Sequence, residues 1–262
     1  MHKPTFAAII VAAIHGICSN ACSASLNTNL LSNPGFESNL DGWTTDHGAI
    51  RNSSPLPHGG TNYLIGGMDN SSLSYTYQTV DLIGAGFASD DLDGGCLEVH
   101  FGGWQAGYQT QTDRGKVEIV VTDGTNELGR SDLGWFYSNS TWVLKEGTVS
   151  LPQGARFITY GFHAQRYQGS NNDGYLDDAF LELRPSQSPV TILGIAHVDN
   201  SVTLQLADLC VGASYTVFRT PDLLCDCWTE RDTFIAASVT MDWSETVEES
   251  LRQSFYRILT GG

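Results

Sequence analysis

The sequence predicts an all-β protein, in which a jelly-roll β-sandwich is followed by a small second β-sandwich. Short runs alternate apolar and polar residues with a period of two, and we find no long stretch with the period of an amphipathic helix. Gly, Asn and Asp separate these runs and indicate turns. Charged residues make up only 16% of the chain, while small polar and aromatic residues are plentiful, a composition typical of extracellular β-sandwiches.

The N-terminus is typical of a secretory signal peptide. A basic start, Met1 to Lys3, leads into an apolar stretch from Phe6 to Cys18, and small residues precede a cleavage point after Ala24. A lipoprotein signal at Cys22 is the alternative, although Ser19 stands where such signals carry a larger apolar residue. A spanning helix needs about 20 apolar residues, so we expect no membrane span. The protein should be secreted, to the extracellular space or the cell surface.

The charge balance excludes two classes of partner. Asp and Glu number 29 against 13 Lys and Arg, for a net charge of -16. Nucleic acids require a basic surface, and anionic membranes attract basic clusters. We therefore expect neither partner, and an affinity for divalent cations instead. The sequence leaves the oligomeric state open.

The alternating runs divide the chain into segments. Residues 1–24 are the signal peptide, 25–184 the first module, 185–189 a polar, proline-bearing linker and 190–262 the second module. Turns are predicted at Asp123-Gly124, Pro152-Gln153-Gly154 and Asp199-Asn200. Period-two strands are predicted at 97–101, 116–121, 156–162, 179–183, 191–195, 201–206, 215–219 and 255–259.

Two segments at the ends of the first module carry a family resemblance. The first is Asn33-Pro34-Gly35-Phe36-Glu37, followed by Gly42-Trp43, and the second is Asp173-Gly174-Tyr175-Leu176-Asp177-Asp178. Together they resemble the galactose-binding-like jelly roll of many carbohydrate-binding modules, over about residues 26–184. Phe36 and Trp43 are expected to anchor its first strand in the core.

The second module resembles a fibronectin-type-III-like module found at the C-termini of secreted bacterial proteins. The resemblance rests on the run Tyr215-Thr216-Val217-Phe218-Arg219, then Trp228, then Phe255-Tyr256-Arg257. It implies a spacer or an attachment domain, and Tyr215, Trp228, Phe255 and Tyr256 are expected in its core.

Four cysteines remain after signal cleavage. A disulfide from Cys210 to Cys225 or Cys227 is compatible with an oxidising compartment. Cys96 stands alone in the first module unless it reaches across to this group.

A structural calcium is implied by the resemblance. Alternation places Asp177 on the apolar side of its strand with Tyr175, where a carboxylate without a partner is costly. In related modules a calcium ion supplies that partner and is shared with the glutamate that corresponds to Glu37, and Asp178 can join through a bend. The alternative is that Glu37 and Asp177 cap turns or accept backbone N–H groups.

Two predicted loops carry the chemistry of a sugar site. They span Gly102–Gly115 and Ala164–Asp173, and aromatic rings in them stand beside amides and charges. Rings stack on the apolar faces of sugars while polar groups bind the hydroxyls, which here favours a neutral sugar. About half of the aromatics, with Trp104 among them, belong to the core in the competing interpretation. The candidate ligand-binding residues are Trp104, Tyr108, Gln109, Gln111, Asp113, Arg166, Tyr167, Asn171 and Asn172.

Binding is favoured over catalysis. Nucleophile-elbow, zinc-protease and phosphate-loop motifs are absent from the sequence. We therefore expect a secreted, non-catalytic protein that binds a glycan or polysaccharide. The alternatives are a structural or adhesive surface or matrix protein without a sugar ligand, and a small glycoside hydrolase whose two acids lie far apart in the chain.

Overall fold

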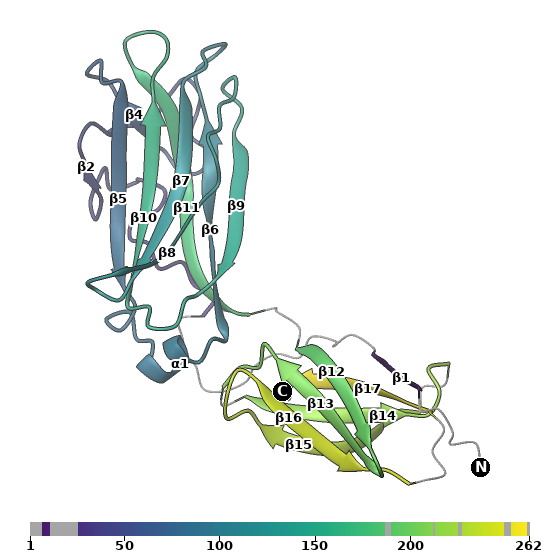
Figure 1. Ribbon diagram of the computed structural model, residues 1–262. Coiled ribbons are helices and arrows are strands. Elements are labelled where there is room, and N and C mark those ends of the chain that lie inside the picture. Colours follow the sequence, from purple (N-terminus) through teal and green to yellow (C-terminus); the bar gives the residue numbers. More distant parts are fainter. Residues whose placement is uncertain are drawn as a thin grey trace. The chain divides into compact units, whose positions relative to one another are not determined.

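The computed structural model describes residues 7–10, 26–186, 190–211, 213–224, 227–248 and 253–260. Within these ranges nearly all regular structure is β-strand, and the five-residue α1 (Ser89–Asp93) is the one helix (Figure 1). The predicted all-β fold class is confirmed.

The chain forms two compact units. We call residues 23–93 and 97–184 the jelly-roll unit, and residues 185–262, together with 1–22 and 94–96, the C-terminal unit.

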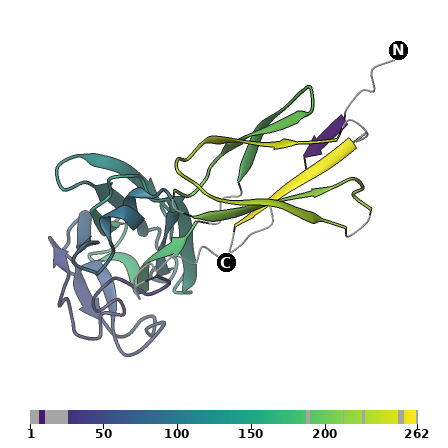
Figure 2. The same cartoon turned by 90° about the horizontal axis from the view of Figure 1, so that it is seen from below.

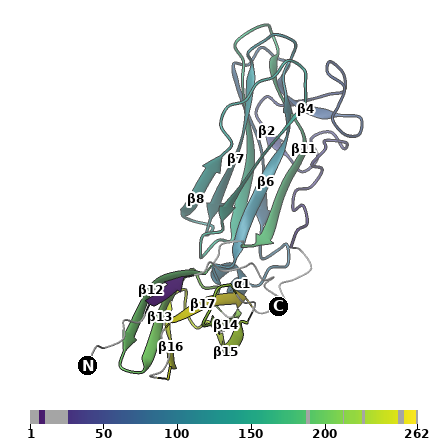
Figure 3. The ribbon, with the colours of Figure 1, turned by 90° about the vertical axis from the view of Figure 1, so that its right-hand side faces the viewer.

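Two five-stranded sheets, labelled here the first and the second, build the jelly-roll unit. Strands distant in sequence are neighbours in both sheets, and Figure 3 shows β7 and β8 in one layer and β6 and β11 in the other. The first sheet has the order β2 (Thr44–Thr45), β5 (Leu73–Asp81), β10 (Phe157–Gln165), β7 (Arg114–Thr122), β8 (Glu127–Asp132). The second sheet has the order β3 (Ala49–Arg51), β4 (Tyr63–Gly67), β11 (Asn172–Pro185), β6 (Leu97–Ala106), β9 (Val143–Ser150).

Aromatic side chains fill the core of this unit. Phe36 and Trp43 are buried as expected, with ring centroids 5.1 Å apart, and Trp43 meets the edge of Tyr160 at 5.9 Å. The Tyr160 hydroxyl donates to the Gly102 carbonyl at 2.7 Å, so even this fully buried polar atom has a partner. The segment that carries the resemblance is therefore also the segment that closes the core.

Strand β11 confirms the expected alternation. Tyr175, Asp177, Ala179 and Leu181 are all buried, while Asp178 is partly exposed and has a φ of 43°. The left-handed backbone at Asp178 is a local bend of the kind expected there.

Turn chemistry explains the tight connections. The Asp123 carboxylate accepts the backbone N–H groups of Thr125 and Asn126 at 2.7 and 2.6 Å, which closes the predicted turn between β7 and β8. Ala155 donates to the Pro152 carbonyl between β9 and β10, where a second turn was expected.

The C-terminal unit also consists of two sheets (Figure 2). Its core is apolar and contains Trp243 and Tyr256, whose rings meet edge to face at 6.2 Å. Asp199-Asn200 connects β12 and β13 as predicted, and Asp199 has a φ of 51°. One sheet has the order β1 (Ala7–Ile10), β17 (Gln253–Thr260), β14 (Ser214–Thr220), β15 (Thr229–Ile235), and the other β12 (Thr191–Val198), β13 (Ser201–Ala207), β16 (Met241–Thr246).

Of the four aromatic residues expected in this core, Tyr215 and Tyr256 belong to it, Phe255 is buried outside this cluster, and Trp228 is not buried. Tyr215, Phe255 and Tyr256 are buried, whereas Trp228 is partly exposed. The Arg257 guanidinium lies 4.5 Å from its ring centroid, so Trp228 packs on a cation at the surface instead. The fibronectin-type-III-like identity of this unit stays a prediction.

Cysteine pairing is described only in part. Cys227 is disulfide-bonded, while Cys225 lies outside the described residues. The identity of the cysteine bonded to Cys227 therefore stays a prediction.

Most of the predicted signal peptide, and linker residues 187–189, lie outside the described residues. Within the signal segment, Ala7–Ile10 forms β1 and pairs with β17 in parallel. In the described parts of the chain, no helix has the length and hydrophobicity needed to cross a membrane. Secretion stays a prediction from the sequence.

Candidate functional site

A continuous row of flat side chains crosses the outer side of the first sheet. Tyr77 stacks on Tyr75 at 5.1 Å, Tyr75 on His163 at 4.4 Å, and His163 meets Trp135 edge to face at 6.5 Å. The Arg114 guanidinium lies 4.6 Å from the Trp135 ring centroid and 5.0 Å from that of Tyr167. We call this row the aromatic face; it consists of Tyr75, Tyr77, Trp135, His163, Tyr167 and Arg114.

Strand register builds one half of the aromatic face. Tyr75 and Tyr77 alternate with inward-facing residues of β5, and Tyr75 stands directly opposite His163 of β10. Gly161, the partner of Tyr77, has no side chain, and a Cβ atom there would lie 2.5 Å from Cε2 of Tyr75. The Tyr75 ring therefore lies over this glycine, close to the backbone of β10.

A short bridge presents the other half. Gly115 and Phe136 exchange two backbone hydrogen bonds of 2.8 Å, which hold the segment after β8 beside the start of β7. Trp135 is thereby placed over Arg114, and its side chain remains 40% exposed. Tyr167, from the loop after β10, is 52% exposed.

A charged network lies beside the row. The nearly buried Glu118 accepts from Arg130 at 2.7 Å and His163 at 3.2 Å, and lies 3.4 Å from Lys116. Burial acts to raise the pKa of Glu118, but hydrogen bonds and charge from His163 and Arg130 outweigh it, so the pKa is lowered. Glu118 therefore stays ionised and fixes the cations around it.

The two loops predicted to bind sugar do meet, but through a buried residue. One Asp113 oxygen accepts the N–H groups of Tyr167 and Gln168, and the other accepts that of Asp173, at 2.6–3.0 Å. Asp113 and Asn172 are 0% exposed, so neither side chain can contact a ligand, which corrects both assignments. Both polar side chains instead hold backbone groups inside the fold.

Other predicted residues in these loops also serve the fold. Arg166 donates to three backbone carbonyls, those of Asn70, Ser71 and Gly169, at 2.7–3.1 Å. Gln111 is partly buried beside Gly169, and Asn171 is partly buried just before β11.

The remaining predicted residues belong with the second sheet. Trp104 lies in β6 rather than in a loop, and His58 stacks on its ring at 3.8 Å. Tyr108 packs beside Tyr63 and Tyr175, and Gln109 donates to the Tyr108 hydroxyl at 3.1 Å. Trp104 and Tyr167, which we expected to share one site, are thus separated between the two sheets.

The three acidic residues proposed for calcium converge on three glycines. Added Cβ atoms at Gly35 and Gly59 would lie 3.2 and 2.9 Å from Oδ1 of Asp178, and one at Gly60 would clash with the Glu37 carboxylate. The site is therefore a cradle that side chains would fill. Burial, followed by the charge of Asp178, raises the pKa of Asp177 to about 6.

Backbone donors meet these carboxylates. Asp177 accepts the N–H groups of His58 and Gly59 at 2.8 and 3.1 Å, and Glu37 accepts those of Thr61 and Asn62. Among the described residues, no group of three or more His, Cys, Asp or Glu side chains has the arrangement of a metal centre. The His58 ring also holds Asp178 Oδ2 at 2.6 Å, so a calcium ion would replace this contact. The three carboxylates and the glycine cradle still fit a calcium ion, which prefers oxygen ligands.

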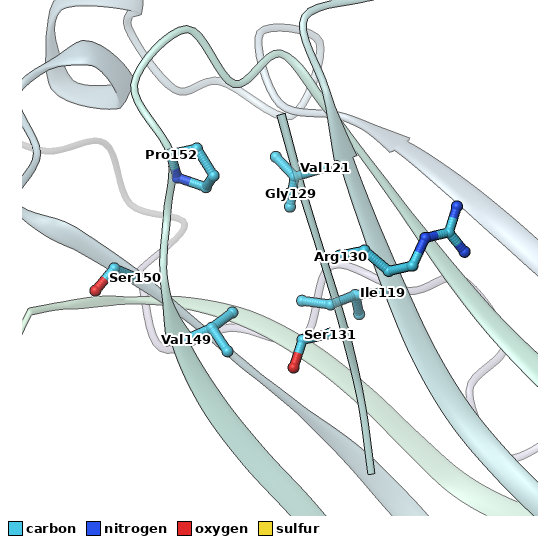
Figure 4. Close-up of a pocket in the computed structure, with 8 residues that line it drawn as sticks. All are labelled: Ile119, Val121, Gly129, Arg130, Ser131, Val149, Ser150 and Pro152. Atoms are coloured by element: carbon cyan, nitrogen blue, oxygen red, sulfur yellow. The ribbon is translucent and has the colours of Figure 1, made fainter. Parts of the chain in front are cut away.

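One cavity of about 150 Å³ opens between β8 and β9, at the edges of the two sheets (Figure 4). Mostly apolar residues line it, and Figure 4 shows the Arg130 guanidinium turned away from it. Its polar lining side chains are Arg130, Ser131 and Ser150, and without an acid, a base or a metal ligand beside them the two hydroxyls form no catalytic arrangement. Its lining residues are Ile119, Val121, Gly129, Arg130, Ser131, Val149, Ser150 and Pro152.

Sequence reasoning missed Tyr75, Tyr77, His163 and the role of Arg114. A signal was present, because Ser-Tyr-Thr-Tyr-Gln in β5 alternates aromatic with polar residues. The aromatic positions of this alternation face outward and its polar positions face inward, which is the inverse of an ordinary strand.

No protein-family model and no curated protein matches the chain. Solved structures do match. The carbohydrate-binding module TmCBM61, in complex with β-1,4-galactotriose, is 21% identical over 59% of this chain and 98% of its own, with a TM-score of 0.41. The CBM22-1 xylan-binding domain of Paenibacillus barcinonensis Xyn10C is 15% identical over 63% and 99%, with a TM-score of 0.42.

A Stig cyclase from Fischerella sp. TAU is 12% identical over 62% of this chain and 98% of its own, with a TM-score of 0.45. At such scores the likenesses decide nothing about ligand or activity. The solved structures that match this chain include carbohydrate-binding modules.

Proposed function

We propose that this chain is a secreted, non-catalytic carbohydrate-binding protein that holds a polysaccharide against the aromatic face. The observation that carries this proposal is the row of rings from Tyr77 to Tyr167 on the outer side of a sheet. Rings on the outer face of a sheet add nothing to the core and expose apolar area to water. Large exposed apolar patches of this kind mark ligand-binding sites.

The chemistry of the row suits a sugar. Trp135 and Tyr167 expose ring surface that can cover the C–H groups of a pyranose, while Arg114, Gln165 and His163 offer hydrogen bonds for hydroxyls. The stacked Tyr75 and His163 cannot each offer a free face, so Trp135 and Tyr167 supply the main stacking surfaces.

Replacing Tyr167 or Trp135 by alanine should weaken binding to a polysaccharide by more than about 1 kcal/mol, because stacked rings dominate such interfaces. Binding can be measured by isothermal titration against a ligand found on a glycan array. Tyr137→Ala is the matched control, since Tyr137 is 58% exposed and makes no ring contact with the aromatic face among the described residues. Equal affinity of all three variants and wild type would place the site elsewhere, and a wild type that binds no glycan would favour the structural or adhesive alternative.

The carboxyl groups support binding rather than hydrolysis. A general acid needs a raised pKa and access to substrate. Burial raises the pKa values of Asp173 and Asp177, but both side chains are buried, and Glu118 on the sheet has a lowered pKa.

Incubation with polysaccharides that bind should therefore release no reducing ends above the background of buffer alone. Sustained release that one acidic substitution abolishes would make the chain a hydrolase. Release that survives every single Asp or Glu substitution would indicate a contaminating enzyme.

We also propose a structural calcium held by Glu37, Asp177 and Asp178. When bound, the ion would supply positive charge to carboxylates that the fold brings together at Gly35, Gly59 and Gly60. This role concerns stability alone, because none of the three residues belongs to the aromatic face. Glu37 lies in the segment before β2, and Asp177 and Asp178 lie in β11 of the second sheet.

A further inference from the structure

Resting on the proposed glycan-binding function, we infer that the aromatic face selects acidic polysaccharides, with Arg114 binding the carboxylate of a uronic acid residue. An acidic sugar thus replaces the neutral sugar that loop composition alone predicts.

Arg114 differs from the other cations near the row in its electrostatic surroundings. Lys116 lies 3.1 Å from Asp132 and 3.4 Å from Glu118, and Arg130 is paired with Glu118 and Glu127. Among the described residues Arg114 forms no ion pair, and its contacts are with the Gln165 amide and two rings. The row therefore contains one guanidinium whose charge no carboxylate neutralises.

Only part of the Arg114 guanidinium is hydrogen-bonded within the protein. Its Nε and Nη2 atoms donate to the Gln165 oxygen at 3.0 and 2.6 Å, while Nη1 has no acceptor among the described residues. A guanidinium has five N–H donors, and the Nη1–Nη2 edge can bind both oxygens of a carboxylate. Gln165 thus fixes one edge of the group and leaves the other for an anion.

The flanking rings suit a uronic acid in particular. Its carboxylate is attached directly to the pyranose ring, so a sugar lying on Trp135 or Tyr167 brings its anion to the guanidinium between them. The planar cation is already oriented by both rings and by Gln165, so little side-chain freedom remains to be lost on binding.

The charge of the whole chain opposes non-specific binding of an acidic polymer. A net charge of -16 repels polyanions, so general electrostatic adsorption cannot explain retention of an acidic polymer. Any affinity that depends on the carboxylates of such a polymer has to come from a specific cation.

The full chain should bind polygalacturonate at least about tenfold more tightly than the same polymer after its carboxyl groups are reduced to alcohols, as expected for a charge-assisted bidentate contact. Affinity electrophoresis in gels containing either polymer measures this ratio. Arg114→Gln should reduce the ratio to near one, and Arg114→Lys should leave an intermediate value, because a point charge replaces the fork. Arg156→Gln is the control, since it changes net charge equally while Arg156 pairs with Asp93.

Different failures have different meanings. Equal binding of both polymers by the wild type, or a ratio that Arg114→Gln and Arg156→Gln lower equally, would overturn the uronate proposal and leave glycan binding intact. Retention of dextran sulfate in preference to dextran, without retention of polygalacturonate, would assign Arg114 to a sulfate ester and overturn the uronate. Binding to no polymer on a broad glycan array would overturn the proposed function, and the inference with it.

Discussion

The Asp113→Ala variant should lose at least about 3 kcal/mol of the free energy of unfolding of the jelly-roll unit. The buried Asp113 carboxylate accepts the backbone N–H groups of Tyr167, Gln168 and Asp173. Hydrogen bonds to a charged group contribute about 1.5–3 kcal/mol each, and a buried donor without an acceptor costs about 1–3 kcal/mol. Alanine leaves all three donors unpaired at the point where the loop after β10 enters β11.

Urea unfolding monitored by tryptophan fluorescence measures this loss. Asp113→Asn should retain part of the stability, because an amide oxygen can accept from fewer of the three donors. Asp41→Ala is the control, since Asp41 is exposed and its carboxylate has no hydrogen bond among the described residues, so its effect should stay within about 0.5 kcal/mol. If Asp113→Ala and Asp41→Ala unfolded at the same urea concentration, Asp113 would not be the acceptor that holds this loop.

The same residue shows why the site was harder to predict than the fold. Asp113 and Asn172 have the chemistry of sugar-binding residues, and the sequence does not distinguish a side chain that bonds a hydroxyl from one that bonds a backbone N–H. Burial makes that distinction, and it depends on contacts between residues far apart in the chain. Composition therefore indicated the kind of chemistry but not which of its residues face solvent.

Strand prediction succeeded where alternation and burial agree. In β7 the alternating Val117, Ile119 and Val121 are buried, and so are the alternating apolar residues over 179–183 of β11, and both strands were predicted. In β5 the inward positions Ser74, Thr76 and Gln78 are polar and the outward ones aromatic, so no apolar face was apparent and the strand was missed. The inward-facing Gln78 amide forms hydrogen bonds with the backbone of Ser32 and Gly42. These bonds satisfy the polar groups that an apolar residue at this position would not have.

The sequence also did not show which residues of the aromatic face are neighbours, because they come from different strands. Tyr75 stands opposite His163 because β5 and β10 are neighbours in the first sheet, although much of the chain separates them. By contrast, the family resemblance implied that Glu37 and Asp177 share a site, and both side chains lie within 4 Å of the place that a Cβ atom at Gly35 would take. The calcium ion itself stays a prediction.

Calcium should reverse the pH dependence of stability that Asp177 imposes. Burial raises the pKa of Asp177 to about 6 in the folded protein, above the value of about 3.9 expected in the unfolded chain. The protonated form is therefore favoured by folding, and its stabilisation is complete below about pH 4 and is lost as pH rises through 6. The difference corresponds to about 3 kcal/mol at most. A bound divalent cation favours the ionised form and removes this loss.

In chelator, the melting temperature of the wild type should rise as pH falls from 7 to 5. With calcium at a hundredfold excess over its dissociation constant, stability at pH 7 should instead increase by about 2.7 kcal/mol. Asp177→Asn should abolish the calcium response and the share of the pH response that belongs to this carboxyl. The comparison with Asp177→Asn is needed because His47, whose pKa is raised by its hydrogen bond to Asp69, also gains protons as pH falls below 7.

The carboxylates with lowered pKa values do not disturb this window. The pKa of Asp123 is lowered to about 2 by hydrogen bonds from Asn126 and Thr125, so the stability it contributes is lost only at much lower pH. Identical melting curves of the wild type in chelator and in excess calcium at pH 7 would show that Glu37, Asp177 and Asp178 serve only their protein partners, which are backbone N–H groups, the Thr61 hydroxyl and the His58 ring. Asp177 is the buried carboxylate of the three, so its loss should weaken calcium binding most. A calcium response that persists in Asp177→Asn would therefore place the ion at other residues.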